Sequence, residues 1–322
     1  MEIGYGLSSE EHAPLDLVRN AVRAEELGFT FAGISDHFHP WVEQQGHSSF
    51  VWAVVGAIGH ATERIRVGTG VTCPTVRTHP AIVAQAAATA ACLMPGRFFL
   101  GVGSGEALNE HIVGDRWPPA PVRLAMLEEA VKVIRVLWEG GSKDHYGTHY
   151  TVEDATIFDL PDELPAIVVA AAGPQAARLA GRIGDGMWSV GPDSQAVATF
   201  DGEGGGDKPR YAQAVMCWAD DEAEARRTAH REWPNVAVTG QLSQDLPTPA
   251  HFDQAIQMVT EDDVAASVPC GPDVARHVEA VQEFADAGFT HVYLQQVGPD
   301  QDGFFGFWER ELQPALRQEG LL

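Results

Sequence analysis

The segment VGTGVTCPTVRTHPAIVAQAAAT (67–89), followed closely by LMPGRFFLGVGSGEALNE (93–110), contains one strand–helix–strand unit. The apolar runs 65–72 and 98–102 are typical of strands that are buried on both faces. The alanine-rich stretch 80–94 between them is typical of a helix, because it begins with a proline and ends before a Pro-Gly pair. Two such strands joined by a helix predict a parallel βαβ unit.

The same alternation continues along the whole chain. Strands are predicted at 2–7, 31–35, 65–72, 98–102, 166–171, 186–190, 212–218 and 290–296. Helices are predicted at 15–27, 50–62, 80–94, 123–138, 175–183, 221–233, 273–287 and 307–317. Eight strands with intervening helices favour an α/β fold of the closed (β/α)8 TIM-barrel type over an open doubly wound sheet.

No linker divides the chain, so residues 1–322 are predicted to form a single domain. The segment DGEGGGDK (201–208) predicts a flexible loop that replaces or shortens a helix. Residues 234–266 form an insertion before the last strand, and the sequence does not indicate its structure.

Charge and cysteine content exclude several classes of protein. With 21 basic and 45 acidic residues the net charge is −24, which disfavours nucleic acid and membrane surfaces as partners. The four cysteines lie far apart and form no CxxC pair, so neither a disulfide framework nor a zinc ribbon is predicted. There is no leader-like N-terminal segment and no apolar stretch of about 18 residues, so a soluble cytoplasmic protein is expected.

In a barrel of this type the carboxyl ends of the strands carry the functional site. The second strand leads into DHFHPW (36–41), the third into GTGVTCP (68–74) and the fourth into GVGSGEALNE (101–110). Two histidines, a tryptophan and a glutamate are therefore expected to converge, beside glycine-rich backbone that a flat group can approach closely.

Simpler interpretations exist for each of these elements. Asp36 could cap a turn, and His37 or His39 could be hydrogen-bonded loop histidines. The glycines at 101–105 resemble a dinucleotide-binding loop, but the third falls one residue early and the strand is the fourth. No third ligand follows Asp36, His37 and His39 at a recognisable spacing, so no metal site is predicted.

Taken together, DHFHPW, 67–89 and 93–110 resemble the luciferase-like flavin and deazaflavin oxidoreductases. The similarity is greatest to the branch with coenzyme F420-dependent glucose-6-phosphate dehydrogenase and secondary alcohol dehydrogenase. It covers nearly the whole chain and is weakest across 194–266. The resemblance implies a (β/α)8 barrel that forms a homodimer and binds F420.

The resemblance also implies roles for individual residues. His37 matches the histidine that takes the hydroxyl proton, Trp41 a tryptophan lining the reaction pocket, and Glu106 a carboxylate near the reducible ring. The peptide bond from Gly70 to Val71 matches a non-proline cis bond behind the ring. The residues matched to cofactor contacts are Asp36, Gly70, Val71, Thr72, Gly105, Asn109, Ala172 and Gly173, the last at a helix N-terminus suited to phosphate.

The predicted reaction is hydride transfer between F420 and a non-phosphorylated alcohol or carbonyl compound. Asp193 stands about where the sugar-phosphate enzymes have a lysine, and 255–275 contains no Lys or Arg, so a phosphate dianion would lack cationic donors. Trp41, Trp52, Met187 and Trp188 are expected to wall the pocket, while Lys208, Arg210 or Arg231 could still bring a cation to it. The alternatives are an FMN-dependent monooxygenase, an F420-dependent sugar-phosphate dehydrogenase and a non-catalytic flavin- or deazaflavin-binding barrel.

Overall fold

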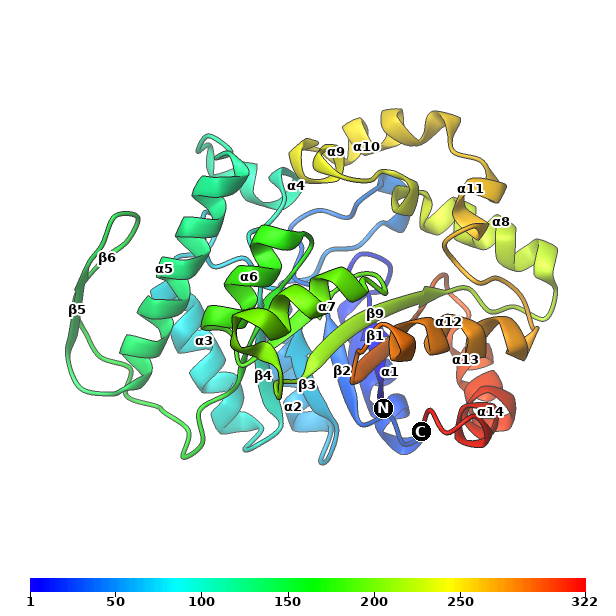
Figure 1. Cartoon of the computed structure of the whole chain (residues 1–322), viewed down its shortest axis with the longest axis horizontal. Coiled ribbons are helices and arrows are strands. Elements are labelled where there is room, and N and C mark those ends of the chain that lie inside the picture. The colour runs from blue at the N-terminus through cyan, green and yellow to red at the C-terminus, as the bar shows by residue number, and fades with distance from the viewer.

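The computed structural model describes all 322 residues, and its centre is a closed parallel barrel of eight strands (Figure 1). Around the barrel the order is β1-β10-β9-β8-β7-β4-β3-β2. Their bounds are β1 Glu2–Leu7, β2 Phe31–Ile34, β3 Arg66–Thr69, β4 Phe98–Val102, β7 Ile167–Ala170, β8 Gly186–Ser189, β9 Arg210–Met216 and β10 His291–Gln296. All eight predicted strands are present, and the predicted (β/α)8 barrel is confirmed.

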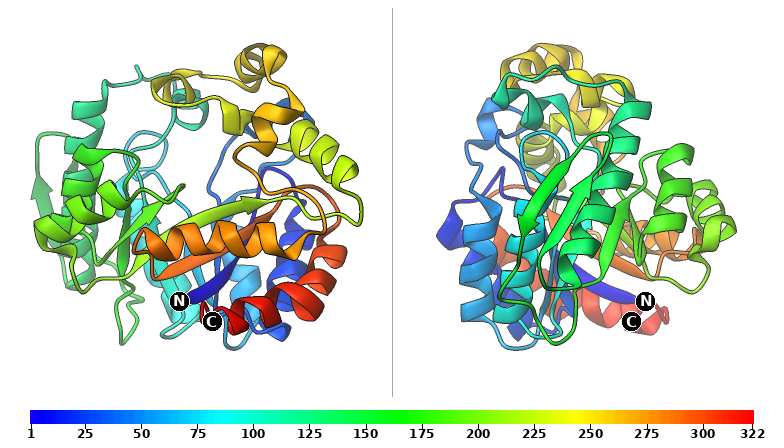
Figure 2. Two further views of the ribbon diagram at one scale, coloured as in Figure 1. Left: turned by 45° about the vertical axis from the view of Figure 1, so that its right-hand side comes forward. Right: turned by 90° about the vertical axis from the view of Figure 1, so that its left-hand side faces the viewer.

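Helices surround the barrel, and the two chain ends meet at the bottom, where the Met1 amine donates to Leu321 O at 3.0 Å (Figure 2). The helices of the barrel wall are α1 Pro14–Glu26, α2 Val51–Ala61, α3 Pro80–Leu93, α5 Ala120–Trp138, α6 Pro174–Ile183, α7 Ser194–Phe200, α8 Glu222–Glu232, α12 Val274–Asp286, α13 Gln301–Phe307 and α14 Gln313–Gln318. The last helical segment begins earlier than predicted because the Asp300 side chain caps it by accepting from Gly303 N. None of the helices combines the length and the apolarity that a bilayer crossing would need.

A hairpin outside the barrel was not predicted. It consists of β5 Lys143–Tyr146 and β6 Thr151–Ala155, and it stands at the edge of the molecule beside α5 (Figure 1). Three consecutive backbone N–H groups of its turn, 148–150, donate to the Glu129 carboxylate on α5. The hairpin is polar and half exposed, so the apolar-run pattern used for the barrel strands does not detect it.

The segment 201–208, predicted as a flexible loop that replaces or shortens a helix, follows the short helix α7 and begins with a π-helical turn, Asp201–Gly205, in which Glu203 and Gly204 depart from helical φ and ψ. Arg210 donates to Asp201 at 2.9 Å, and a Cβ at Gly205 would lie 2.3 Å from the Phe200 ring. The glycine therefore permits close packing against Phe200.

The insertion 234–266 is largely helical and lies over the carboxyl ends of the strands (Figures 1 and 2). It contains 3-10 turns at Pro234–Ala237 and Ile256–Met258, and the helices α9 Gln241–Asp245, α10 Pro249–Ala255 and α11 Glu261–Ala265. Val238 and Phe252 pack with Val42 and Leu108, which follow β2 and β4. The insertion thereby closes one side of the barrel mouth.

Aromatic side chains fill the barrel interior. Phe31, Phe99, Trp188, Tyr211 and Tyr293 form one buried cluster, in which Trp188 stacks on Tyr211 with ring centroids 5.6 Å apart. Glycines on neighbouring strands make room for these rings, since a Cβ at residue 68 would lie 2.1 Å from the Phe99 ring. This layer supplies the floor on which the site is built.

Candidate active site

A cavity of about 1410 Å³ opens at the carboxyl ends of the strands. Trp188 and Tyr293 of the aromatic layer line it from below, and residues 170–172 after β7 line one side. The insertion lines the opposite side with residues such as Val238 and Gln244. The functional site was predicted at this end of the barrel, and a large cavity with polar and apolar lining lies there.

His37 lies in this cavity with both ring nitrogens accounted for. Its Nδ1 is 3.1 Å from His39 O, and since a carbonyl can only accept, Nδ1 carries the proton in this contact. Its Nε2 is 3.3 Å from Glu10 Oε1. The ring is therefore oriented with Nε2 available to exchange a proton beside a carboxylate.

Glu10 is a functional candidate that the sequence reasoning missed. Its carboxyl is enclosed, and its Oε2 accepts from Ser35 Oγ at 2.6 Å and Ser8 Oγ at 3.1 Å. These two bonds orient the carboxylate so that Oε1 faces His37. The only available signal was its position just after the first strand, at the same end of the barrel as DHFHPW.

Trp41 and Glu106 also line the cavity. The Trp41 ring lies 4.9 Å from the His37 ring and packs edge-on against Phe252 of the insertion. Glu106 immediately precedes the short helix α4, Ala107–Glu110, and none of the side-chain hydrogen bonds in the protein involves it. The cavity therefore brings together the His37 imidazole, the carboxylates of Glu10 and Glu106, and the Trp41 indole.

Asp36 belongs to a buried ion network below the cavity. Arg77 Nη2 lies 2.9 Å from Asp36 Oδ1, and Arg77 Nε lies 3.4 Å from Glu110 Oε1. Thr72 Oγ1 donates to Asp36 Oδ2 at 2.7 Å. Burial alone would lower the pKa of Arg77, but the charges of Asp36 and Glu110 outweigh it and raise that pKa. Burial raises the pKa of Glu110, against the opposing N–H and charge of Arg77.

The peptide bond between Gly70 and Val71 is cis, as the resemblance implied, and both residues line the cavity. Asn109 Oδ1 accepts from the backbone N–H groups of Phe38 (2.9 Å) and His39 (3.3 Å), which ties α4 to the loop that holds His37. Its Nδ2 is buried without a partner. An unpartnered amide donor at such a place is what a bound cofactor would satisfy.

The structure separates the predicted residues into two groups. Those that line the cavity are His37, Trp41, Glu106, Gly70, Val71 and Ala172. Those that lie next to it without lining it are Asp36, Thr72, Gly105, Asn109 and Gly173. His39, the other histidine of DHFHPW, does not line the cavity, and its Nδ1 lies 2.8 Å from Leu108 O.

Two predicted wall residues are wrong. Trp52 packs against Phe98 outside the barrel, and Met187 is fully buried in the core, because strand residues alternate between the two faces of the barrel wall. Trp41 and Trp188 do line the cavity.

The cavity contains a single basic residue, Arg123. Its guanidinium lies 4.4 Å above the Trp117 ring and donates to Pro118 O (2.7 Å) and Gln244 Oε1 (2.6 Å). Burial lowers the pKa of Arg123, with Asp245 and other acidic groups opposing. Arg123 thus holds the insertion to the start of α5.

The other basic residues considered from the sequence do not reach the cavity. Lys208 donates to Gly181 O, Arg210 pairs with Asp201, and Arg231 pairs with Glu232. Asp193, which stands where a lysine was expected, caps α7 by accepting from two backbone N–H groups. No three His, Cys, Asp or Glu side chains come together as metal ligands.

A family model described as luciferase-like monooxygenase matches residues 1–291. The chain belongs to the luciferase-like family. Among its relatives are F420-dependent glucose-6-phosphate dehydrogenases from Tsukamurella paurometabola and Mycobacterium avium, which are 34% and 36% identical to it. Both alignments span 334 residues and cover 99% of this chain and 99% of the relative.

Solved structures agree with this assignment. An F420-dependent secondary alcohol dehydrogenase in complex with an F420-acetone adduct matches the luciferase-like chain with a TM-score of 0.91 at 31% identity. That match covers 98% of this chain and 99% of the other. A coenzyme F420-dependent tetrahydromethanopterin reductase from Methanopyrus kandleri, 22% identical with a TM-score of 0.78, shares the fold.

The carboxyl of Glu11, next to Glu10 in the chain, is expected to make the stability of this luciferase-like protein depend on pH. Glu11 Oε1 accepts from Gly298 N at 2.8 Å, while Oε2 is buried without a partner. Burial raises the pKa of Glu11 to about 8, with Glu10 and Glu232 adding to the shift. The folded state therefore retains a proton that the unfolded chain releases near pH ~4.3.

We expect Glu11→Gln to stabilise the protein increasingly as the pH rises. Between pH ~4.3 and about 8 the parent loses stability on the order of 1 kcal/mol per pH unit, because its folded state binds more protons than its unfolded state; above about 8 the loss levels off. Glutamine carries no charge and keeps the acceptor for Gly298. Denaturant unfolding at several pH values measures the difference, with the exposed Glu163→Gln as control. A difference independent of pH would contradict the prediction.

Proposed function

We propose that this protein is a coenzyme F420-dependent oxidoreductase that interconverts a neutral alcohol and the corresponding carbonyl compound. The observation that carries the proposal is the His37–Glu10 pair, which sets Nε2 of an oriented imidazole in the cavity beside the Gly70–Val71 peptide. The F420-dependent relatives at 31–36% identity support the choice of cofactor.

The residues present fit the deazaflavin. Gly70 and Val71 offer a flat backbone surface, and the unpartnered Nδ2 of Asn109 offers a donor. The turn at Ala172–Gly173 precedes α6, whose N-terminal N–H groups suit the phosphodiester of the cofactor. When bound, F420 supplies a ring carbon that accepts or donates hydride.

The protein's own contribution is to hold the substrate and manage its proton. As the alcohol carbon becomes a carbonyl, its hydroxyl proton moves to Nε2 of His37, whose Nδ1–H remains bonded to His39 O. The negative charge of Glu10 at 3.3 Å attracts the imidazolium that forms. Glu106, which also lines the cavity, would hold or supply a proton at the cofactor ring. In the reductive direction each proton returns along the same path.

The cavity chemistry favours a substrate without phosphate. Its only basic residue, Arg123, already has a stacking partner and two acceptors, whereas Glu10, Glu106, Asp245 and Glu283 add negative charge to the lining. A phosphate dianion there would meet one guanidinium against four carboxylates, so much of its charge would stay unpaired at high energetic cost. Neutral, partly apolar alcohols fit the indole and carboxamide lining better.

The test compares initial rates with isopropanol, a larger secondary alcohol and glucose 6-phosphate at saturating F420. We expect a kcat/KM at least tenfold higher for the best neutral alcohol. We also expect F420 to bind at least tenfold more tightly than FMN, a difference of about 1.4 kcal/mol. A higher kcat/KM for the sugar phosphate would reject the neutral substrate class. Equal affinity for FMN would favour the flavin-dependent alternative, and F420 binding with no turnover of any alcohol would favour a non-catalytic barrel.

We further propose that residues 1–322 act as one domain and that the protein is a homodimer. Exposed apolar side chains at Phe50, Ile82 and Leu93, at the start of α2 and on α3, offer a self-association surface. A monomeric mass in analytical ultracentrifugation would reject the dimer.

A further inference from the structure

A shallow groove of about 290 Å³ runs along the outside of the barrel between α5 and α6. From α6 it is lined by Gln175, Arg178, Leu179 and Arg182, and from α5 by Pro121, Leu124, Ala125 and Glu128. Positions 175, 178 and 182 fall on one face of α6, because residues three and four apart are neighbours on a helix. The groove therefore presents two guanidinium groups in a row.

Arg178 is exposed and has no carboxylate within 4.0 Å, although the protein carries a net charge of −24. Arg182 has only a loose contact of 3.9 Å with Glu128. Both arginines are thus available to an anion that enters from outside.

The groove begins next to the active-site cavity. Pro121, in the first turn of α5, lines both of them. The turn at Ala172–Gly173, assigned above to the cofactor phosphate, leads directly into the first turn of α6 at the head of the groove. Arg178 follows Gln175 by about 4.5 Å along the helix axis and Arg182 by about 10.5 Å.

We propose that this groove, defined by Arg178 and Arg182 on α6, binds the anionic oligoglutamate tail of coenzyme F420. The inference rests on the proposed cofactor. Beyond its phosphodiester, F420 ends in a chain of glutamates that each carry a carboxylate, so an acidic protein needs local cations to hold it. The tail leaves the cavity past Pro121 and lies along α6, with its carboxylates facing first Arg178 and then Arg182.

The test is equilibrium binding, followed by the fluorescence of the deazaflavin. The probes are F420 with a long tail, F420 with a short tail and the tail-free deazaflavin nucleoside analogue. For the parent we expect affinity to increase with tail length at low salt, and this increase to vanish at about 0.5 M salt because exposed ion pairs are screened. In Arg178→Gln with Arg182→Gln, we expect the long-tail affinity to fall roughly three- to tenfold and the tail-free affinity to stay unchanged.

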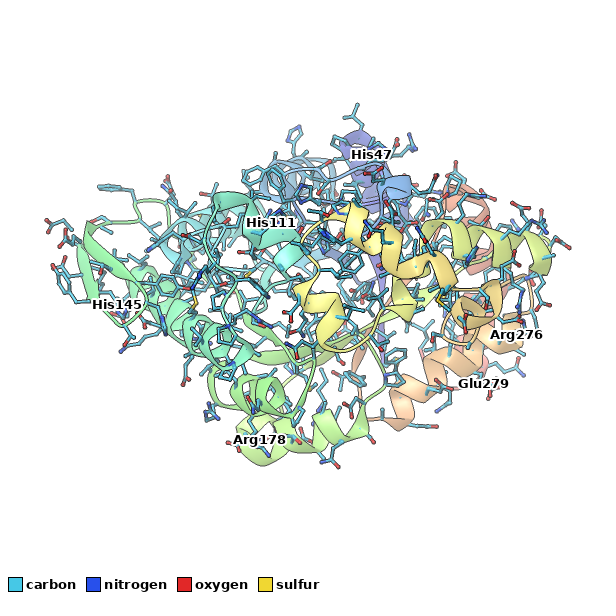
Figure 3. All side chains as sticks on the ribbon, turned by 90° about the horizontal axis from the view of Figure 1, so that it is seen from above. His47, His111, His145, Arg178, Arg276 and Glu279 are labelled. Carbon is cyan, nitrogen blue, oxygen red and sulfur yellow. The ribbon has the colours of Figure 1, made fainter.

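Arg276→Gln with Arg227→Gln is the matched control, since it removes the same two positive charges from α12 and α8. Figure 3 shows Arg276 well away from Arg178. Equal loss in this control would assign the effect to net charge and overturn the proposal. Equal affinity of the parent for all three deazaflavins would also overturn it, while leaving the proposed function intact. Failure of every deazaflavin to bind would instead reject the proposed function itself.

Discussion

His37→Ala is expected to lower kcat by roughly 100- to 10,000-fold while the protein still binds F420. His37 is the only imidazole among the residues that line the cavity, and its Nε2 is the one nitrogen there that can take the hydroxyl proton. Its removal leaves the Gly70–Val71 backbone and Asn109 in place, so cofactor affinity should change little. Single-turnover reduction of F420 by the alcohol, followed by absorbance, measures the loss.

Two controls test whether the loss of rate comes from the missing proton acceptor. Added imidazole should restore part of the rate in His37→Ala, because the cavity left by the side chain can admit it. His39→Ala should lose far less, because that ring bonds to Leu108 O instead of lining the cavity. A near-normal rate in His37→Ala, or an equal loss in both variants, would show that the base lies elsewhere.

Arg77→Met is expected to lower the free energy of unfolding by about 3–5 kcal/mol at pH 7. Arg77 is the only cation in contact with Asp36 and Glu110, and both of these carboxylates are buried. Methionine fills similar space but leaves two charges without a partner. Chemical denaturation followed by circular dichroism measures the change.

The pH dependence distinguishes lost charge pairing from lost packing. In Arg77→Met the folded state should hold a proton on Glu110, whose pKa is already raised by burial, so its deficit should shrink as the pH falls toward about 4–5. Arg135→Met, which breaks the exposed pair with Asp185, should cost less than ~1 kcal/mol at any pH. A deficit in Arg77→Met that is constant with pH would attribute the loss to packing.

The barrel could be predicted because its signals are local. Each strand is a short apolar run, and each helix has its own periodicity and end signals, so all eight strands were found. The hairpin at 143–155 and the turn at 201–205 carry no such local signal, so they were not predicted. Both depend on partners elsewhere in the chain, Glu129 in one case and Arg210 in the other.

The candidate site divides in a similar way. DHFHPW and the glycine-rich strand ends could be placed at the barrel mouth from sequence, since parallel strands put all their carboxyl ends on one side. Which neighbours meet there could not be predicted. Glu10 faces His37 across two adjacent strands, and Arg77 lies between Asp36 and Glu110, from three separate loops.

The barrel, its mouth and the residues that point to a deazaflavin could be predicted from the sequence. The proton partner of His37, the single-cation lining of the cavity and the groove beside α6 became visible only in the folded chain. Helix and strand patterns arise from contacts between near neighbours in the chain. Charge pairing and cavity lining instead depend on distances between segments that only the closure of the barrel brings together.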